Sequence, residues 1–123
     1  MSRHPVQLAR VYDPHRPEDG ARVLVDRLWP RGIKKEDAAL DSWPKALTPS
    51  TELRRWYHAG GDFPAFRERY LAELDAPEAA DALTGLRTLA ATGPVVLLTA
   101  SKGDLGTSHA AVLRELLAHP GLS

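Results

Sequence analysis

The stretch from Arg22 to Gly32 reads Arg-Val-Leu-Val-Asp-Arg-Leu-Trp-Pro-Arg-Gly and carries the main signal for the fold. Its part from Val23 to Leu28 is nearly continuous in apolar character, which is typical of a central strand covered on both faces. Pro30 and Gly32 end this strand, because proline cannot donate to a sheet ladder. The polar and aromatic residues in and after the apolar run are Asp26, Arg27, Trp29 and Arg31. We therefore expect planar hydrogen-bond donors and an aromatic face at one sheet edge.

A second strand is predicted from Val95 to Thr99, and it also ends in polar residues. The chain continues as Ala-Ser-Lys-Gly-Asp over residues 100–104. In open sheets of parallel strands the ligand crevice lies beyond the carboxyl ends of the strands. If the two strands are parallel neighbours, both polar clusters are expected to meet in one hollow.

The rest of the chain mixes strand and helix patterns. Weaker strands are predicted at 8–12 and 42–47, and helices at 34–40, 48–58, 62–74 and 78–92, with a last helix from Thr107 or Ser108 to Pro120. Thr48 and Pro49 are typical of a helix N-cap and first turn. This mixture favours an α/β sandwich with a mainly parallel central sheet flanked by helices. The length suits a single domain over residues 1–123.

Composition excludes several functional classes. The chain has no cysteine, so disulfides, thiolate catalysis and Cys-type zinc sites are ruled out, and its five histidines show no metal-ligand spacing. We therefore expect neither a metal nor a cofactor.

No apolar run approaches a membrane span and the N-terminus lacks a secretory signal, so a cytoplasmic location is expected. Sixteen basic residues balance sixteen acidic ones, which lowers the expectation of nucleic-acid binding without excluding a local basic patch.

Arg27 and Arg31 are candidate anion ligands. Their planar guanidinium groups match phosphate or carboxylate oxygens in a bidentate geometry. The structural alternative is that they pair with Asp26, Asp37 or Asp41. Trp29 is a candidate for stacking on a base or sugar, although an aromatic residue beside a core strand often serves packing alone.

The segment from Ser101 to His109 holds the other candidates. It is a polar strand-to-helix turn that could expose backbone N–H groups to an anion, but it lacks the order of a Walker loop. Ser101 and Lys102 are candidate ligand contacts, and Lys102 is also a candidate nucleophile if it is desolvated. His109 and Asp26 are candidate acid–base groups, with helix capping and structural pairing as their alternatives.

Several of these motifs together resemble a family of bacterial proteins, the YeaO-like family, which has no established activity. The matching segments are 10–13, 22–35, Trp43, 47–50, 53–58, 69–70, 73–74 and 97–102 with His109 and Ala110. The string Val-Asp-Arg-Leu-Trp-Pro-Arg-Gly is long and unusual in composition, so the match is specific. The resemblance implies a small single-domain α/β protein whose polar motif positions are Arg27, Trp29, Arg31, Lys102 and His109.

Three functions remain open from the sequence. The first is a small-ligand protein, with or without catalysis, that binds a phosphate- or carboxylate-bearing molecule such as a nucleotide at the carboxyl edge of the sheet. The alternative is a nucleic-acid-binding or regulatory protein that uses the basic patch from Arg22 to Lys35. The third is an interaction module that presents Trp29, Trp43 and Trp56 to another protein. Neither the reaction nor the oligomeric state follows from the residues.

Overall fold

The computed structural model describes residues 5–14, 16 and 20–118. Its centre is a sheet in the order β1-β3-β2, formed by β1 (Val6–Arg10), β2 (Ala21–Leu24) and β3 (Val95–Thr99). Both β1 and β2 pair with β3 in parallel, and Val23 lies opposite Leu97. The two strands that the sequence predicts to carry the polar clusters are therefore parallel neighbours, and their carboxyl ends share one edge.

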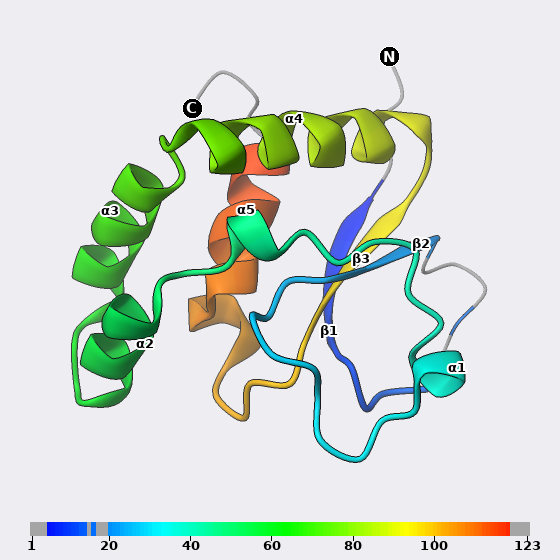
Figure 1. Cartoon of the computed structure of the whole chain (residues 1–123), viewed down its shortest axis with the longest axis horizontal. Coiled ribbons are helices and arrows are strands. Elements are labelled where there is room, and N and C mark those ends of the chain that lie inside the picture. Colours follow the sequence, from blue (N-terminus) through cyan, green and yellow to red (C-terminus); the bar gives the residue numbers. More distant parts are fainter. Residues whose placement is uncertain (1–4, 15, 17–19, 119–123) are drawn as a thin grey trace.

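Five α-helices surround the sheet within the described residues. They are α1 (Lys35–Ala38), α2 (Thr51–His58), α3 (Phe63–Glu73), α4 (Pro77–Thr92) and α5 (His109–Ala118), with short 3-10 helices η2 (Lys45–Leu47) and η3 (Leu105–Thr107). In Figure 1, α2, α3 and α4 form an outer layer and α5 lies between α3 and the strands, while α1 stands apart at the other end. The protein is thus a single α/β domain with helices packed against an all-parallel sheet.

Strand β3 is buried along its whole length because both of its faces are covered. Val95 and Leu97 belong to the main core with α2 to α5, whereas Val96 and Leu98 belong to a smaller cluster with Val11. This alternation follows from the two-residue period of a strand. The continuous apolar run in the sequence is explained by a strand that has no solvent-facing side.

The helix predicted at 62–74 is present as α3. Asp62 precedes α3, and its carboxylate accepts a hydrogen bond from the N–H of Ala65 at 3.2 Å. Phe63, Phe66, Tyr70 and Leu74 recur at helical spacing, which predicts a common buried face. The last three are buried, whereas Phe63 is only partly buried.

Other local predictions are wrong in detail. The strand predicted at 42–47 is reduced to an isolated bridge between Ser42 and Val23, followed by η2, because Pro44 cannot extend a ladder. The cap of α2 is Ser50 and not Thr48: its hydroxyl accepts from the N–H of Leu53 at 3.1 Å.

Two strand boundaries also differ from the predictions. Strand β1 lies at 6–10 instead of 8–12, and β2 ends at Leu24 instead of reaching Leu28. The chain nevertheless continues the β2 ladder by one bond, from the N–H of Val25 to the carbonyl of Leu98 at 3.0 Å. The predicted end of the last helix at Pro120 lies outside the described residues. No helix in the described ranges is long and apolar enough to cross a bilayer.

Candidate functional site

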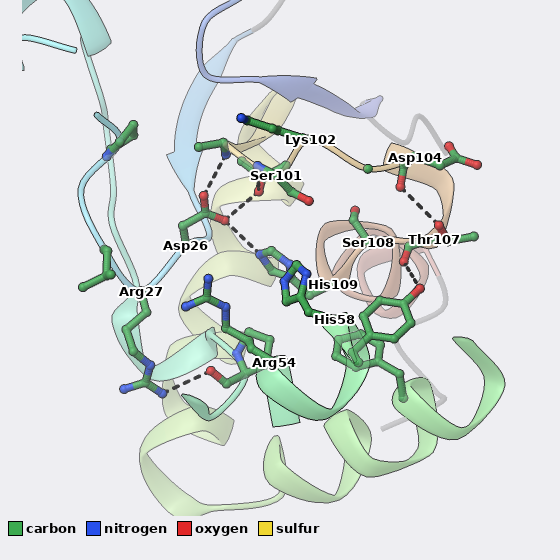
Figure 2. Close-up of a pocket in the computed structure, with 18 of the residues that line it drawn as sticks. Asp26, Arg27, Arg54, His58, Ser101, Lys102, Asp104, Thr107, Ser108 and His109 are labelled. Atoms are coloured by element: carbon green, nitrogen blue, oxygen red, sulfur yellow. Dashed lines mark hydrogen bonds and ion pairs between the residues drawn. The ribbon is translucent and has the colours of Figure 1, made fainter. Parts of the chain in front are cut away.

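A pocket of about 740 Å³ lies beyond the carboxyl ends of β2 and β3. It is bordered by the segments 26–31 and 99–109 and by side chains from α2, and Figure 2 shows it in close-up. The lining includes every candidate residue that the sequence predicts, namely Asp26, Arg27, Trp29, Arg31, Ser101, Lys102 and His109. Two distant segments therefore border one cavity, whose volume lies in the range of small-molecule pockets.

Asp26 joins the two strand ends to the last helix. Its Oδ1 accepts from the Thr99 hydroxyl at 2.6 Å and lies 3.1 Å from Nε2 of His109, and its Oδ2 accepts from the N–H of Ala100 at 2.7 Å. Burial on its own would raise the pKa of Asp26. The hydrogen bonds from His109, Ala100 and Thr99 outweigh burial and hold that pKa below its ordinary value. Asp26 is thus an ionised residue that links three elements, and among the described residues it forms no salt bridge with an arginine.

The contacts of His109 fix its tautomer. Nε2 lies 2.9 Å from the carbonyl oxygen of Val25 as well as 3.1 Å from the Asp26 carboxylate. A carbonyl oxygen only accepts hydrogen bonds, so we assign a proton to Nε2, which donates to both oxygens. Any exchange of a proton with a ligand would have to use Nδ1.

The charged ends of Arg27 and Lys102 do not converge. Arg27 donates from its guanidinium to the carbonyl of Pro49 at 3.2 Å, and Figure 2 shows this group well apart from the ammonium of Lys102. Both side chains are exposed and border different parts of the same pocket. The alternative that Arg27 and Arg31 pair with Asp26, Asp37 or Asp41 is wrong: within the described ranges neither arginine forms an ion pair.

Arg54 and His58 on α2 also line the pocket, although the sequence does not single them out as site residues. In Figure 2 the half-buried Arg54 points its guanidinium toward Asp26 and His109. Their spacing of four residues places both on one helix face, a signal that is readable in the sequence. Only the packing of α2 beside the sheet edge decides that this face borders the pocket.

The lining carries an excess of positive charge. The lining includes the cations Arg27, Arg31, Arg54 and Lys102 and, among the described residues, two carboxylates, those of Asp26 and Asp104. Asp26 is held by three internal donors, and Asp104 accepts from the N–H of Gly106 at 2.9 Å. Among the described residues none of the four cations lies within salt-bridge distance of a carboxylate. The excess of two positive charges is therefore not neutralised by salt bridges in the part of the chain that the structure describes.

Trp29 shapes the turn that follows β2. Its indole N–H donates to the carbonyl of Ile33 at 2.7 Å, and its ring meets Trp43 edge to face at a centroid distance of 5.3 Å. These contacts give Trp29 the packing role that the sequence leaves as its alternative, although Trp29 is also one of the residues that line the pocket. The rim is completed by Tyr12 and Leu28, which are 51% and 70% exposed.

Two side chains in the turn from β3 to α5 cap the helices η3 and α5. The carboxylate of Asp104 occupies the N-terminus of η3 through Gly106, and the hydroxyl of Ser108 accepts from the N–H of Ala111 at 3.4 Å at the start of α5. At the N-terminus of the last helix, a possible anion site from the sequence, the Ser108 hydroxyl thus already takes the N–H of Ala111. Earlier in the turn, the N–H groups of residues 102–104 have no acceptor among the described residues.

Comparison with known proteins places the chain in a family. Residues 5–121 match the family model described as the inactive DUF488-N3 subclade. The uncharacterized protein YeaO of Escherichia coli K12 is 50% identical over 113 residues, which cover 91% of this chain and 96% of that protein. The uncharacterized protein Rv3073c of Mycobacterium tuberculosis H37Rv is 46% identical over 113 residues, covering 91% of this chain and 92% of that protein. No solved structure is significantly similar. With a match over almost its whole length and relatives this similar, the chain belongs to the YeaO-like proteins of the inactive DUF488-N3 subclade.

Proposed function

We propose that the protein binds a small phosphate- or carboxylate-bearing ligand, such as a nucleotide, in the pocket beyond β2 and β3. The observation that carries this proposal is that Arg27, Arg31, Arg54 and Lys102 border one cavity and form no salt bridge with any described carboxylate. Guanidinium groups bind oxyanions through paired hydrogen bonds, and such bonds strengthen where the site is partly shielded from water. A ligand anion would supply the negative charge that the lining lacks.

Binding without turnover agrees best with the site. Nε2 of His109 is engaged by Val25 and Asp26, and the Asp26 carboxylate accepts three hydrogen bonds from the protein itself. The description of the subclade as inactive points in the same direction. We therefore assign Asp26 and His109 a structural role in the pocket wall. Lys102 then contributes a positive charge at the rim of the pocket.

The nucleic-acid alternative receives less support from the same residues. Arg22, the first residue of the basic patch, is only 6% exposed and donates from Nε to the carbonyl of Ala38 at 3.0 Å. The patch is therefore not one continuous surface from Arg22 to Lys35. Binding of DNA or RNA at low salt that falls steeply as salt rises would favour this alternative over the small-ligand proposal.

Arg54 offers the sharpest test of ligand binding. Titration calorimetry and thermal shift with inorganic phosphate, adenosine monophosphate and acetate should detect binding to the wild type, because a ligand that binds only the folded state raises its stability. Arg54→Ala should weaken binding by about 10-fold or more, since a hydrogen bond to a charged group contributes roughly 1.5–3 kcal/mol.

Arg55→Ala is the matched control for Arg54→Ala. Arg55 is exposed on the same helix but does not border the pocket, so its loss removes the same charge without removing a ligand contact. Its affinity should stay close to that of the wild type. Equal losses in both variants, or no binding of any of the three anions to the wild type, would overturn the proposal.

A further inference from the structure

Arg10, at the end of β1, holds the loop after β3 through three successive peptide carbonyls. Its guanidinium donates to the carbonyl oxygens of Ser101 at 2.6 Å, Lys102 at 3.4 Å and Gly103 at 2.9 Å. These three residues border the pocket, whereas Arg10 does not. Arg10 therefore contacts the loop from the side that faces away from the cavity.

The planarity of the peptide bond fixes the direction of the N–H groups on this loop. In a trans peptide the C=O of one residue and the N–H of the next point in opposite directions, and the chain has no cis peptide in its described part. Carbonyls of Ser101, Lys102 and Gly103 that point at Arg10 thus turn the N–H groups of residues 102–104 away from it, toward the cavity. Within the described ranges these three N–H groups have no acceptor.

The same loop already binds an anionic oxygen one step earlier. The N–H of Ala100 donates to the carboxylate of Asp26 at 2.7 Å, and Asp26 lines the pocket. The N–H of Ser101 is taken by the hydroxyl of Thr99 at 3.1 Å. The N–H groups with no acceptor begin directly after these two, beside the charge of Lys102. Successive backbone N–H groups that face one concavity are a known way of binding anions.

We propose that the N–H groups of Lys102, Gly103 and Asp104 form the subsite for the phosphoryl group of the ligand, and that Arg10 is the positioning residue that turns them toward the pocket. A phosphoryl group presents three terminal oxygens, which match three consecutive donors better than the two oxygens of a carboxylate do. This inference rests on the proposed function, because it names the ligand class and the contact point of the same pocket.

The direct test is an amide-resolved NMR titration of the wild-type protein with inorganic phosphate. The N–H resonances of residues 102–104 should move downfield and saturate with the dissociation constant measured by calorimetry. Phosphate that binds with these three resonances unchanged would overturn the subsite and leave the proposed function standing. If phosphate does not bind at all, both fail. Acetate that moves the same resonances with equal affinity would overturn the phosphoryl assignment.

Arg10→Ala tests the positioning role. It should weaken phosphate binding by about 10-fold, the scale of one lost charge-assisted hydrogen bond, and the downfield shifts of residues 102–104 should shrink. Arg10→Lys should recover only part of the affinity, because an ammonium cannot hold three carbonyls in the geometry of a planar fork.

The salt dependence of phosphate affinity distinguishes a positioning role of Arg10 from long-range electrostatic attraction. A charge that acts only through its field is screened at high ionic strength. The affinity ratio between the wild type and Arg10→Ala should therefore persist in high salt, whereas a ratio that collapses to one would contradict positioning. The wild-type titration remains decisive even if Arg10→Ala does not fold.

Discussion

Nε2 of His109 lies 3.1 Å from Oδ1 of Asp26, and this contact links the first residue of α5 to the chain that leaves β2. The same imidazole nitrogen donates to the carbonyl of Val25, so the last helix is tied to the sheet edge by side chain and backbone together. The contact holds one wall of the pocket in place.

The first prediction concerns acid stability. The pKa of Asp26 in the folded protein lies below its ordinary value of 3.8, because hydrogen bonds from His109, Ala100 and Thr99 outweigh burial. The unfolded state therefore binds the proton more readily, and stability that is present above pH 3.8 is lost as pH falls through the lower folded-state pKa. Denaturant unfolding across the acidic range should show that Asp26→Asn removes this part of the pH dependence. An unchanged acid profile would contradict the role of Asp26.

A second prediction separates steric collision from backbone strain at two glycines. Gly20 and Gly32 have similar positive φ angles of 69° and 76°. A Cβ on Gly20 would lie 2.1 Å from the carbonyl oxygen of Pro94, whereas a Cβ on Gly32 would meet nothing within 4 Å. Gly32→Ala should lower the free energy of unfolding by about 1–2 kcal/mol, because alanine disfavours the left-handed conformation. Gly20→Ala should lower it by roughly 1–3 kcal/mol more because of overpacking, as measured by chemical denaturation. Equal losses of unfolding free energy in the two variants would show that the turn at Gly20 can shift to avoid the collision with Pro94.

The third prediction uses the buried Tyr70. Burial, followed by the charges of Glu73 and Asp26, raises the pKa of its phenol well above the ordinary value of 10.0, and its hydroxyl donates to the carbonyl of Leu47. The unfolded state loses the phenolic proton first, so stability should fall as pH rises above 10. Tyr70→Phe should lose about 1–2 kcal/mol at neutral pH, because the Leu47 carbonyl is left without its donor. The variant should also lack this alkaline decline in denaturation experiments. A normal tyrosinate titration of Tyr70 in the folded wild type would contradict the prediction.

A fourth prediction ranks two arginines of the pocket. Arg27 is exposed and donates to the carbonyl of Pro49, whereas Arg54 is half-buried and points toward Asp26 and His109. Solvent screening weakens an exposed contact more than a shielded one. Phosphate affinity measured by calorimetry should therefore fall less in Arg27→Ala than in Arg54→Ala. The reverse order would place the anion on the Pro49 side of the pocket.

The class of the fold is readable from particular residues of the sequence. The nearly continuous apolar runs that begin at Val23 and Val95 indicate buried strands, because a strand covered on both faces lacks polar alternation. Asp62 and the helical spacing of Phe66 and Tyr70 indicate α3, since caps and periodicity act over a few residues. Where several neighbouring residues compete for one role, as Thr48 and Ser50 do for the cap of α2, local pattern does not choose between them.

The amino-acid sequence by itself determined the parallel α/β class, the family and the two polar segments at the strand ends, because these depend on local composition and periodicity. Only the tertiary structure decided that β2 and β3 are neighbours, that α2 brings Arg54 to the pocket and that Arg10 holds the opposite side of the 101–103 loop. Such contacts join residues far apart in the chain. They are set by how helices and strands pack, which no local pattern of residues encodes.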